Sequence, residues 1–586
     1  MDRKLKQTKQ SKTMNTIKLI KKYSLSEIFL LILIFFAVIT NILFFFTDNS
    51  IKGVDSPNHL SLSLNFFYSF NSIWTDRCLS LSRKISSFVN LFYNPIENGN
   101  LCWPNGLNLS TAFFYLLMTP SLLIAKISLL PYLVILLMST YGIGKHLFSK
   151  KAGIIAAFLV FMYPIIFKSS RQFQLDFPLT ALVSLSIFFL LKSKAFSKMS
   201  DTILFSLAAA CSMLIKGQTI IFLIGPFLYT IYQSISAHKI TPDIKGKILR
   251  NVTLSCLCFL IIILPWWGKF FTGALSHLYN EVTVVDRATL LVGINNNNAH
   301  GGGFSYYNMG LVKAMNPLLW VTFLISLVCL IKRKNKSMPL LLGWIIIPYC
   351  FFVFTIIVKG TRYLMPLLPA CAIITSGFLA ETNKNRLKQL TLIAVCVLSL
   401  VYFTNDSFLK EKLRLVSLTI SNNFPDTSYE TIVYKRNYNM EKVCSILQAY
   451  SKEKSNILIG LIPAGDIEPF QLSCLLRFHA RKFTVVNILE IFYDFRSKVN
   501  SFDFIIFHRK STDSMPWLGG EELEKLLINS DHGSTLLFFK KQHPDWIKEI
   551  LDQIKTKEKE FELIAAVTGG EERNTKCVYY IFKKIP

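Results

Sequence analysis

The sequence predicts a polytopic α-helical membrane protein with a smaller, extracytoplasmic α/β domain at its C-terminal end. The 586-residue chain is 52% hydrophobic and has a mean hydropathy of +0.40. Its apolar residues form blocks of about 15 to 25 residues, the length that crosses a bilayer. After about residue 405 these blocks give way to short strand-like runs between polar segments, which is typical of a separate α/β domain.

Eleven apolar segments are long enough to be predicted as membrane spans, and we expect about 11 to 13 transmembrane helices in total. They lie at 28–47, 128–144, 152–167, 177–191, 202–215, 219–235, 252–267, 314–331, 338–357, 363–380 and 389–404. A further segment, 109–126, is expected to lie on or dip into the outer face. The first block is long and lacks a small-residue cleavage site, so we expect it to remain as the first span.

The orientation follows from the basic linkers. With these eleven spans, residues 1–26, which contain eight Lys and Arg, lie on the cytoplasmic side. The basic linkers lie on the same side; they are 145–151, 192–201, 236–250, 332–336 and 381–388. That placement satisfies the positive-inside rule, whereas a crossing at 109–126 would turn five basic loops outward. The net charge of +28 therefore reflects the orientation of the spans and does not indicate nucleic-acid binding. We expect the protein to lie in the plasma (inner) membrane.

The chain divides into four predicted parts. Residues 1–26 form a cytoplasmic tail, 27–405 a transmembrane catalytic domain whose first outer loop (48–127) carries juxtamembrane helices, 406–455 a linker with some helix, and 456–586 the α/β domain. Strands of that domain are predicted at Ile457–Ile462, Phe483–Ile488, Phe502–Phe507, Leu536–Phe539 and Cys577–Phe582, with a helix over Pro544–Lys557. Cys78 and Cys102 share the first outer loop, where a disulfide and two free thiols are equally compatible with the sequence.

A set of ionisable residues at the outer ends of the apolar segments indicates a site at that face. Its members are Asp55, Arg171, Asp176, Lys216, Lys359 and Arg362. Charges cost several kcal/mol inside hydrocarbon, so their collection at one membrane face suggests function. Lys359 and Arg362 also run against the positive-inside tendency, which makes them more informative than inward cations.

Asp55, in the segment Gly53–His59, allows a catalytic and a structural interpretation. A carboxylate near the membrane surface serves as general base for an acceptor, or ligates a divalent ion beside a phosphate. An isolated aspartate is, however, more often a turn or cap residue. His59 lies four residues on, and a lone histidine is usually structural.

The other candidate residues also allow both a functional and a structural interpretation. Arg171 either binds a lipid-linked phosphate or snorkels to the interface, and Asp176, two residues before Pro178, is either a site residue or the cap of the next helix. Pro265, Trp266 and Trp267 are expected to end a span in the interfacial aromatic belt. Residues 295–303 form either a substrate lid or an ordinary mobile loop.

These landmarks, in order, resemble the GT-C glycosyltransferases of family 39 and its bacterial relatives, the protein O-mannosyltransferase and aminoarabinose transferase type. The likeness covers about residues 25–405 and rests on Asp55, Ser170–Leu179, Lys216–Gly217, Pro265–Trp267 and Arg362–Pro369. It implies transfer of a sugar, usually with inversion, from a polyprenyl-phosphate carrier at the extracytoplasmic face. The implied roles are catalytic for Asp55 and Asp176, phosphate-binding for Arg171, Lys216, Arg362 and Lys359, and substrate-binding for His59, Trp266, Trp267 and Tyr363.

Two departures from the family pattern matter. Relatives carry a Lys-Pro-Pro segment in the first outer loop, whereas Leu101–Leu107 here contains no lysine, so other cations must bind the phosphate or the donor differs. The single aspartate in place of an acidic pair leaves open whether a divalent metal ion, with Asp55 as ligand, takes part. The sugar and the acceptor, whether lipid, polysaccharide or protein, are not defined.

Two other classes of function compete with the transferase. A transporter or lipid flippase would be expected to bury charges in mid-span and to show inverted repeats, and neither is evident. A non-catalytic membrane scaffold with an outer binding domain is the third reading.

Overall fold

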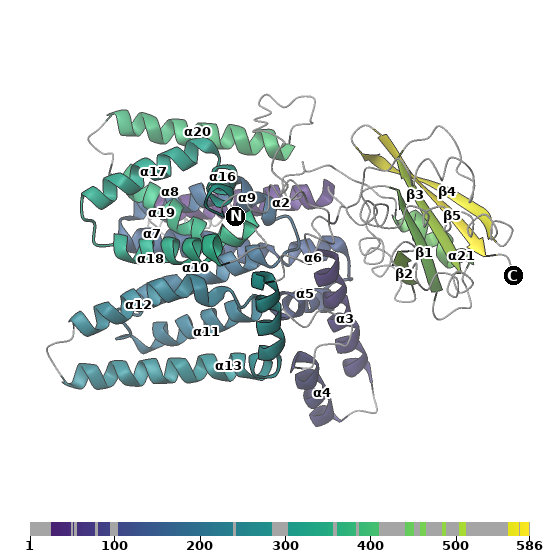
Figure 1. Cartoon of the computed structure of the whole chain (residues 1–586), viewed down its shortest axis with the longest axis horizontal. Helices are drawn as coiled ribbons and strands as arrows, with labels where there is room; N and C mark the ends of the chain where they lie inside the picture. The colour runs from purple at the N-terminus through teal and green to yellow at the C-terminus, as the bar shows by residue number, and fades with distance from the viewer. Residues whose placement is uncertain are drawn as a thin grey trace, which may run out of the picture.

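The structure is a computed structural model (Figure 1). It describes residues 25–47, 51, 56–76, 80–93, 104–237, 242–283, 303–355, 360–381, 386–408, 440–450, 457–464, 483–487, 503–510, 561–572 and 575–584. Most of these residues belong to a helical part, and a five-stranded sheet forms from the C-terminal ones. The predicted fold class, a polytopic helical membrane protein with a C-terminal α/β domain, is confirmed.

The helical part follows the predicted segments closely. Its helices are α2 (Leu25–Thr47), α3 (Ser56–Thr75), α4 (Leu81–Tyr93), α5 (Gly106–Leu117), α6 (Leu122–Ile127), α7 (Leu130–Leu147), α8 (Lys150–Met162), α9 (Pro164–Ser169), α10 (Asp176–Lys192), α11 (Met199–Ile215), α12 (Thr219–Ala237), α13 (Pro242–Thr283), α16 (Gly303–Met315), α17 (Pro317–Lys332), α18 (Met338–Phe354), the 3-10 helix η1 (Thr361–Leu367), α19 (Leu368–Ala380) and α20 (Arg386–Phe408). Five described helical stretches are long and apolar enough to cross a membrane: Leu25–Phe46, Leu122–Leu147, Thr219–Ser236, Gly246–Gly268 and Thr361–Ala380. The other predicted spans are shorter or broken helices.

The expected outer segment 109–126 is two helices. α5 ends at Leu117, and α6 joins α7 in one membrane-length stretch, Leu122–Leu147. The break has a local cause, because Pro120 has no backbone N–H to donate and Ser121 caps α6 by accepting a hydrogen bond from the Ile124 N–H (3.2 Å). Of the segment 109–126, only the part in α5 therefore remains a candidate for a helix that lies on the membrane surface or dips into it.

One predicted span end agrees with the structure, and one predicted span is broken by a bend. The span predicted to end at Pro265–Trp267 agrees with the structure, where the membrane-length apolar stretch runs from Gly246 to Gly268. The helix α13 itself continues to Thr283, and membrane helices tolerate an internal proline because neighbouring groups satisfy the freed carbonyl. The segment predicted at 314–331 is bent by 108° between α16 and α17. Asn316 makes that bend with a φ of 79°, which residues other than glycine seldom adopt, and its side chain caps α17 by accepting from the Leu318 N–H.

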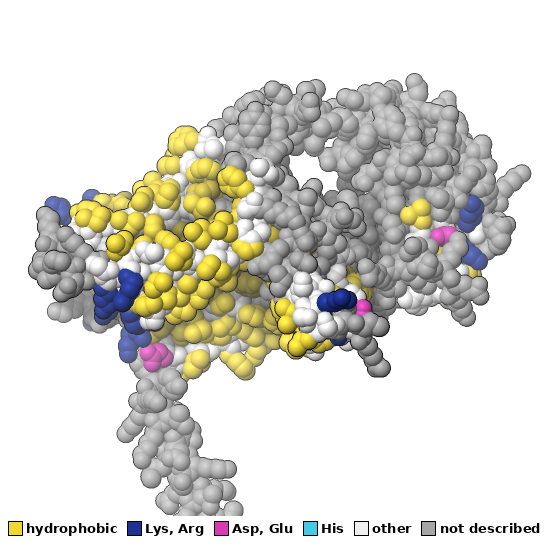
Figure 2. Space-filling model, turned by 90° about the horizontal axis from the view of Figure 1, so that it is seen from below, with side chains coloured by type: hydrophobic (Ala, Val, Ile, Leu, Met, Phe, Trp, Pro, Cys, Tyr) yellow, Lys and Arg dark blue, Asp and Glu magenta, His cyan; other side chains and the backbone are white. Residues whose placement is uncertain are grey.

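A broad apolar surface covers the helical part, with Lys and Arg gathered along one edge (Figure 2). The exposed apolar side chains include Leu257, Ile261 and Leu264 of α13. Contacts between basic linkers and acidic residues occur at the ends of the helices that the sequence places inside, such as Lys145 with Glu27 (3.2 Å) and Arg333 with Glu381. An apolar belt with cations at one end is what a bilayer requires, and the chain is an integral membrane protein.

The orientation of the chain is open to direct test. Cysteine labelling or reporter fusions should place Lys150, Lys245 and Lys334 on the cytoplasmic side, and Asn297 and Asp503 outside. An internal Asp503 would contradict the assignment, because the parity of the spans determines the side on which every outer candidate lies.

The C-terminal sheet has the order β2-β1-β3-β5-β4. Its strands are β1 (Ile457–Ala464), β2 (Phe483–Asn487), β3 (Phe504–Lys510), β4 (Phe561–Glu572) and β5 (Thr575–Lys584). β1 pairs in parallel with β2 and β3, whereas β5 is antiparallel to β3 and β4. Strand β4 was not predicted, and the predicted segments Leu536–Phe539 and Pro544–Lys557 lie outside the described residues. Helix α21 (Met440–Tyr450) falls in the predicted linker 406–455.

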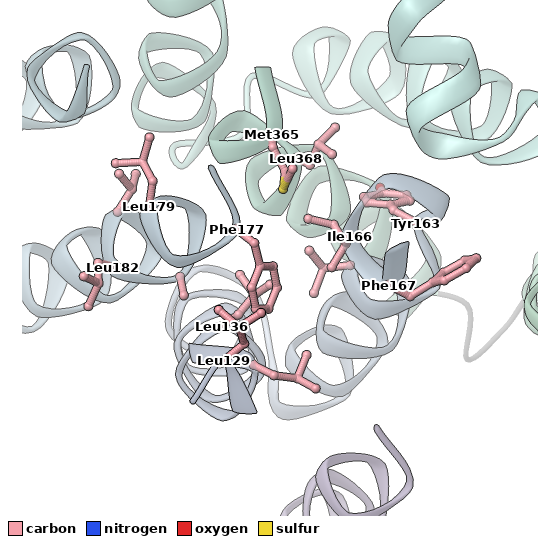
Figure 3. Close-up of a cluster of buried hydrophobic side chains, with 14 of the residues drawn as sticks. Leu129, Leu136, Tyr163, Ile166, Phe167, Phe177, Leu179, Leu182, Met365 and Leu368 are labelled. Atoms are coloured by element: carbon pink, nitrogen blue, oxygen red, sulfur yellow. The ribbon is translucent and has the colours of Figure 1, made fainter. Parts of the chain in front are cut away.

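Buried apolar side chains join the helices next to the end of α9 and the beginnings of α10 and η1. Figure 3 shows Phe177 of α10 among Leu136 of α7, Ile166 of α9 and Met365 of η1. Phe177 follows Asp176 in the chain, and Met365 comes three residues after Arg362. This packing fixes the backbone that carries both of those charged residues.

Candidate functional site

Three of the predicted outer residues form one buried ionic cluster. The Lys216 ammonium donates to Asp176 Oδ1 at 2.8 Å, and the Arg362 guanidinium Nε lies 3.4 Å from Asp176 Oδ2. The side chains of Asp176, Lys216 and Arg362 are 4%, 5% and 14% exposed. One carboxylate thus faces two cations away from water, and the cluster carries a net charge of +1.

The cluster forms where three separate helical elements begin or end. Asp176 is the first residue of α10, Lys216 follows the last residue of α11, and Arg362 is the second residue of η1. The basic residues Lys192 and Lys198 lie at the opposite ends of α10 and α11, about 25 Å away for a helix of this length. The structure therefore brings Asp176, Lys216 and Arg362 together at one end of the helical part.

Asp176 is not the cap that the sequence also allowed. The residue before the helix is Leu175, and it makes no side-chain cap hydrogen bond. Asp176 instead occupies the first turn, where the helix dipole favours a carboxylate. Its two side-chain oxygens contact the two cations.

Tyr363 lies against both cations of the cluster. Its ring centre is 4.7 Å from Lys216 Nζ and 5.4 Å from the Arg362 guanidinium carbon. The ring is itself stacked on Phe352 of α18, with centroids 6.0 Å apart. An aromatic face attracts cations, so Tyr363 helps to hold Lys216 and Arg362 in place.

The two predicted tryptophans support the turn that follows Lys216. Trp266 is 2% exposed and its ring meets that of Trp267 edge to face at 5.1 Å. Trp267 packs on the backbone of Gly217, where an added Cβ would stand 2.4 Å from the indole ring. The indole N–H of Trp267 also donates to the Met213 carbonyl at 3.4 Å. Both residues thus pack into the helical part beside the cluster and not only in an interfacial belt.

Replacing Gly217 by alanine tests the importance of this turn. A methyl group 2.4 Å from the Trp267 ring must displace the ring or the backbone that carries Lys216. We expect Gly217→Ala to lower the turnover of the sugar transfer that the sequence resemblance predicts at least tenfold, the effect of losing about 1.4 kcal/mol of transition-state stabilisation. Gly246→Ala is the matched control, because nothing lies within 4 Å of its added Cβ; equal turnover in both variants would contradict the role of the turn.

Arg171 lies in a different environment. Its Nε donates to Asn41 Oδ1 at 2.8 Å, and Asn41 Nδ2 donates to Ser170 Oγ at 2.9 Å. Its guanidinium also lies over the rings of Phe44, Phe167 and Phe403, at 4.6 to 5.5 Å. These partners join α2, α9 and α20 to the segment before α10, and the residue is 2% exposed. Arg171 does not snorkel to a surface.

His59 is buried on α3, which packs beside α5. One turn further on, the Ser63 hydroxyl donates to the His59 carbonyl at 2.8 Å and makes a longer contact, also as donor, to Asn108 Oδ1 of α5 at 3.5 Å. The start of α5 in turn touches the end of α11, where a Cβ on Gly106 would lie 2.6 Å from the Leu214 carbonyl oxygen. The segment predicted to be the first outer loop therefore reaches the neighbourhood of Lys216 through α5.

Several sequence predictions fall outside the described residues. These are Asp55, Lys359, Cys78, Cys102, residues 101–103 and residues 295–302. Asp55 directly precedes Ser56, the first residue of α3, which is 1% exposed. Within the described part of the chain, no group of three or more His, Cys, Asp and Glu side chains could hold a metal ion.

Sequence reasoning missed three buried polar residues. Asn41 is 0% exposed, Lys126 is 3% exposed and Gln174 is 2% exposed. Asn41 stands inside the first apolar block and Lys126 at the end of the segment 109–126, and a polar residue in such a block is itself a signal of function. Gln174 gave no such signal, because it lies in a polar turn.

Comparison with known proteins supports the predicted resemblance. Residues 106–268 match the family model of dolichyl-phosphate-mannose-protein mannosyltransferases, a stretch that contains Arg171, Asp176, Lys216 and both tryptophans. An uncharacterized protein of Aquifex aeolicus is 23% identical over 256 residues, which is 43% of this chain and 48% of that protein. The chain thus spans about half the length of the curated relative it matches.

Two crystal structures of ArnT from Cupriavidus metallidurans have a similar fold. The apo structure aligns with a TM-score of 0.53 at 12% identity and covers 83% of this chain and 93% of ArnT. The structure bound to undecaprenyl phosphate aligns with a TM-score of 0.55 at 12% identity and covers 94% of this chain and 97% of ArnT. The chain has the GT-C fold of ArnT, which confirms the predicted fold and the resemblance to transferases of this type.

Proposed function

We propose that the protein is a membrane glycosyltransferase that moves a sugar from a polyprenyl-phosphate carrier to an extracytoplasmic acceptor, with inversion. The observation that carries the proposal is the buried ionic cluster of Asp176, Lys216 and Arg362 in a GT-C fold. The match to a mannosyltransferase family over residues 106–268 supports it, and so does the fold shared with an ArnT that binds undecaprenyl phosphate.

The chemistry of such a transfer suits a cluster with an excess positive charge. An acceptor oxygen or nitrogen attacks the anomeric carbon, the bond from that carbon to the phosphate oxygen breaks, and polyprenyl phosphate leaves. The phosphate gains one negative charge as its bond to the sugar breaks. Cations held in place before the reaction stabilise that charge without reorganising, and they act more strongly where water is excluded.

Lys216 and Arg362 are the proposed phosphate-binding residues. Asp176 neutralises only one of them, so a bound phosphate completes the charge balance of the cluster. Asp176 is a positioning residue in this scheme, because both of its oxygens contact the cations. Lys359 precedes Gly360 at the start of η1 and is proposed as a further cation for the same phosphate.

Asp55 is proposed as the general base that takes the proton of the acceptor. It directly precedes α3, whose neighbour α5 touches the end of α11 close to Lys216. Arg171 acts on the site indirectly, because its described contacts fix α2, α9 and α20 around the segment that leads to Asp176. His59, Trp266, Trp267 and Tyr363 shape the surroundings of the donor.

The experiment that tests this proposal measures transfer from polyprenyl-phosphate sugars by Arg362→Ala and Arg362→Lys. Loss of a charge-assisted contact costs about 1.5–3 kcal/mol, so kcat/KM of the alanine variant should fall roughly 10- to 150-fold. Lysine keeps the charge but lacks the planar fork of arginine, and it should recover only part of the activity. Arg333→Ala, a change at the basic end of α17, is the control and should leave kcat/KM unchanged.

Full activity in Arg362→Ala would move the phosphate site away from the cluster. Reduced activity with an unchanged affinity for polyprenyl phosphate alone would likewise contradict a phosphate contact for Arg362.

A further inference from the structure

Two glutamine side chains beside the ionic cluster leave hydrogen-bonding atoms unused. Gln174 is 2% exposed, and its Nε2 is shielded from solvent without a partner in the described structure. Gln218 is half-buried, and its Oε1 is shielded and lacks a partner in the same way. The first atom is a donor and the second an acceptor.

Both glutamines are fixed to the cluster by short turns. Gln174 lies two residues before Asp176 and Gln218 two residues after Lys216. The Gln174 N–H donates to the Gln172 carbonyl at 2.9 Å, and the Gln218 carbonyl accepts from the Ile221 N–H at 3.1 Å. The salt bridge of 2.8 Å between Lys216 and Asp176 holds the two turns next to each other.

An unpaired amide atom away from water is unfavourable. Buried polar atoms in native proteins are nearly always hydrogen-bonded, and each exception calls for an explanation. Two such atoms of complementary kind, both within two residues of the proposed phosphate site, are explained by a ligand that donates and accepts. A hydroxyl group does both, and the part of the donor that carries hydroxyl groups next to its phosphate is the sugar.

We propose that Gln174 and Gln218 hydrogen-bond hydroxyl groups of the transferred sugar and thereby determine which sugar is accepted. The inference rests on the proposed function and deepens it, because it assigns the two amides to the sugar and the cations to the phosphate. The amides keep little affinity for a donor whose corresponding hydroxyl is absent, since they would again be left unpaired.

Gln174→Met and Gln218→Met test the inference, because methionine has nearly the length of glutamine but forms no comparable hydrogen bond. The probes are undecaprenyl phosphates that carry hexoses or pentoses, together with the monodeoxy analogues of the best one. Loss of one neutral hydrogen bond should lower kcat/KM about 2- to 12-fold per variant. With the donor that lacks the matching hydroxyl, the variant and the wild type should be equally active.

Thermal stability separates this role from a structural one. Neither variant loses an existing hydrogen bond at the shielded atom, so the melting temperature of both should equal or exceed that of the wild type. Tyr141→Phe is the matched control: its hydroxyl is also shielded without a partner in the described structure, and its ring lies 5.5 Å from Lys145 at the opposite end of the helical part. It should leave both stability and kcat/KM unchanged.

The outcomes distinguish this inference from the function on which it rests. If the wild type transfers a sugar and both methionine variants match it, or lose the same factor with every deoxy donor, the assignment of the amides is overturned. If the wild type transfers none of the sugars, the proposed function fails and the inference fails with it.

Discussion

Asp55→Asn is expected to lower the turnover of sugar transfer by about 10²- to 10⁴-fold, the usual contribution of general acid–base catalysis. A base needs the carboxylate itself, and the asparagine amide cannot accept the proton of the acceptor. The substitution hardly changes the size of the side chain, so expression and thermal stability should match the wild type. Turnover of the purified variant against the wild type is the measurement.

The structural reading of Asp55 predicts the opposite result. Asparagine caps helices about as well as aspartate does, and Asp55 directly precedes α3. If Asp55 only capped that helix, Asp55→Asn would leave turnover nearly unchanged. Wild-type turnover in this variant would therefore remove the proposed base, although the fold and the phosphate site would stand.

Asp176→Asn is expected to destabilise the protein strongly and to abolish transfer. It leaves Lys216 and Arg362 buried with no carboxylate between them, and breaking a buried pair by removing one partner costs about 3–5 kcal/mol. Thermal unfolding in detergent measures the loss. The double variant Asp176→Asn, Lys216→Met removes one of the two buried cations and should recover most of the stability but no activity.

Asp201→Asn is the matched control for Asp176→Asn. Asp201 is also buried and also contacts two cations, Lys192 at 3.3 Å and Lys198 at 2.5 Å. Those lysines are 41% and 53% exposed, so water can solvate them when the carboxylate is lost, and the effect should stay near 1 kcal/mol or below. Equal destabilisation by both substitutions would show that Asp176 does not neutralise a desolvated cluster.

The placement of the ionic cluster could be predicted from the sequence. Charges are costly in hydrocarbon, so Asp176, Lys216 and Arg362 had to lie at span ends, and the basic linkers determined which ends shared a face. Which of the outer cations meet could not be predicted in this way. Lys216 and Arg362 share Asp176, whereas Arg171 is bound by Asn41 and three aromatic rings from distant segments, a result of tertiary packing.

Local rules also failed where packing outweighed them. The bend at Asn316 depends on one residue with a positive φ; the prediction of one span over 314–331 followed the apolar run and gave no weight to Asn316–Pro317, a pair that favours a turn. Strand β4 was missed because Phe561–Glu572 contains Gly and Glu residues that strands usually lack, and its pairing with β5 compensates for them.

The most direct test of the proposed function is transfer by the purified full-length protein in liposomes that contain undecaprenyl phosphate carrying a radiolabelled hexose or pentose. The proposal predicts that label moves from the lipid to an acceptor supplied from the producing cell's membrane and envelope fraction. It also predicts that free undecaprenyl phosphate accumulates in equal amount, and that Arg362→Ala slows both. Label that stays on the lipid for every sugar in the series, while the protein remains folded, would contradict it.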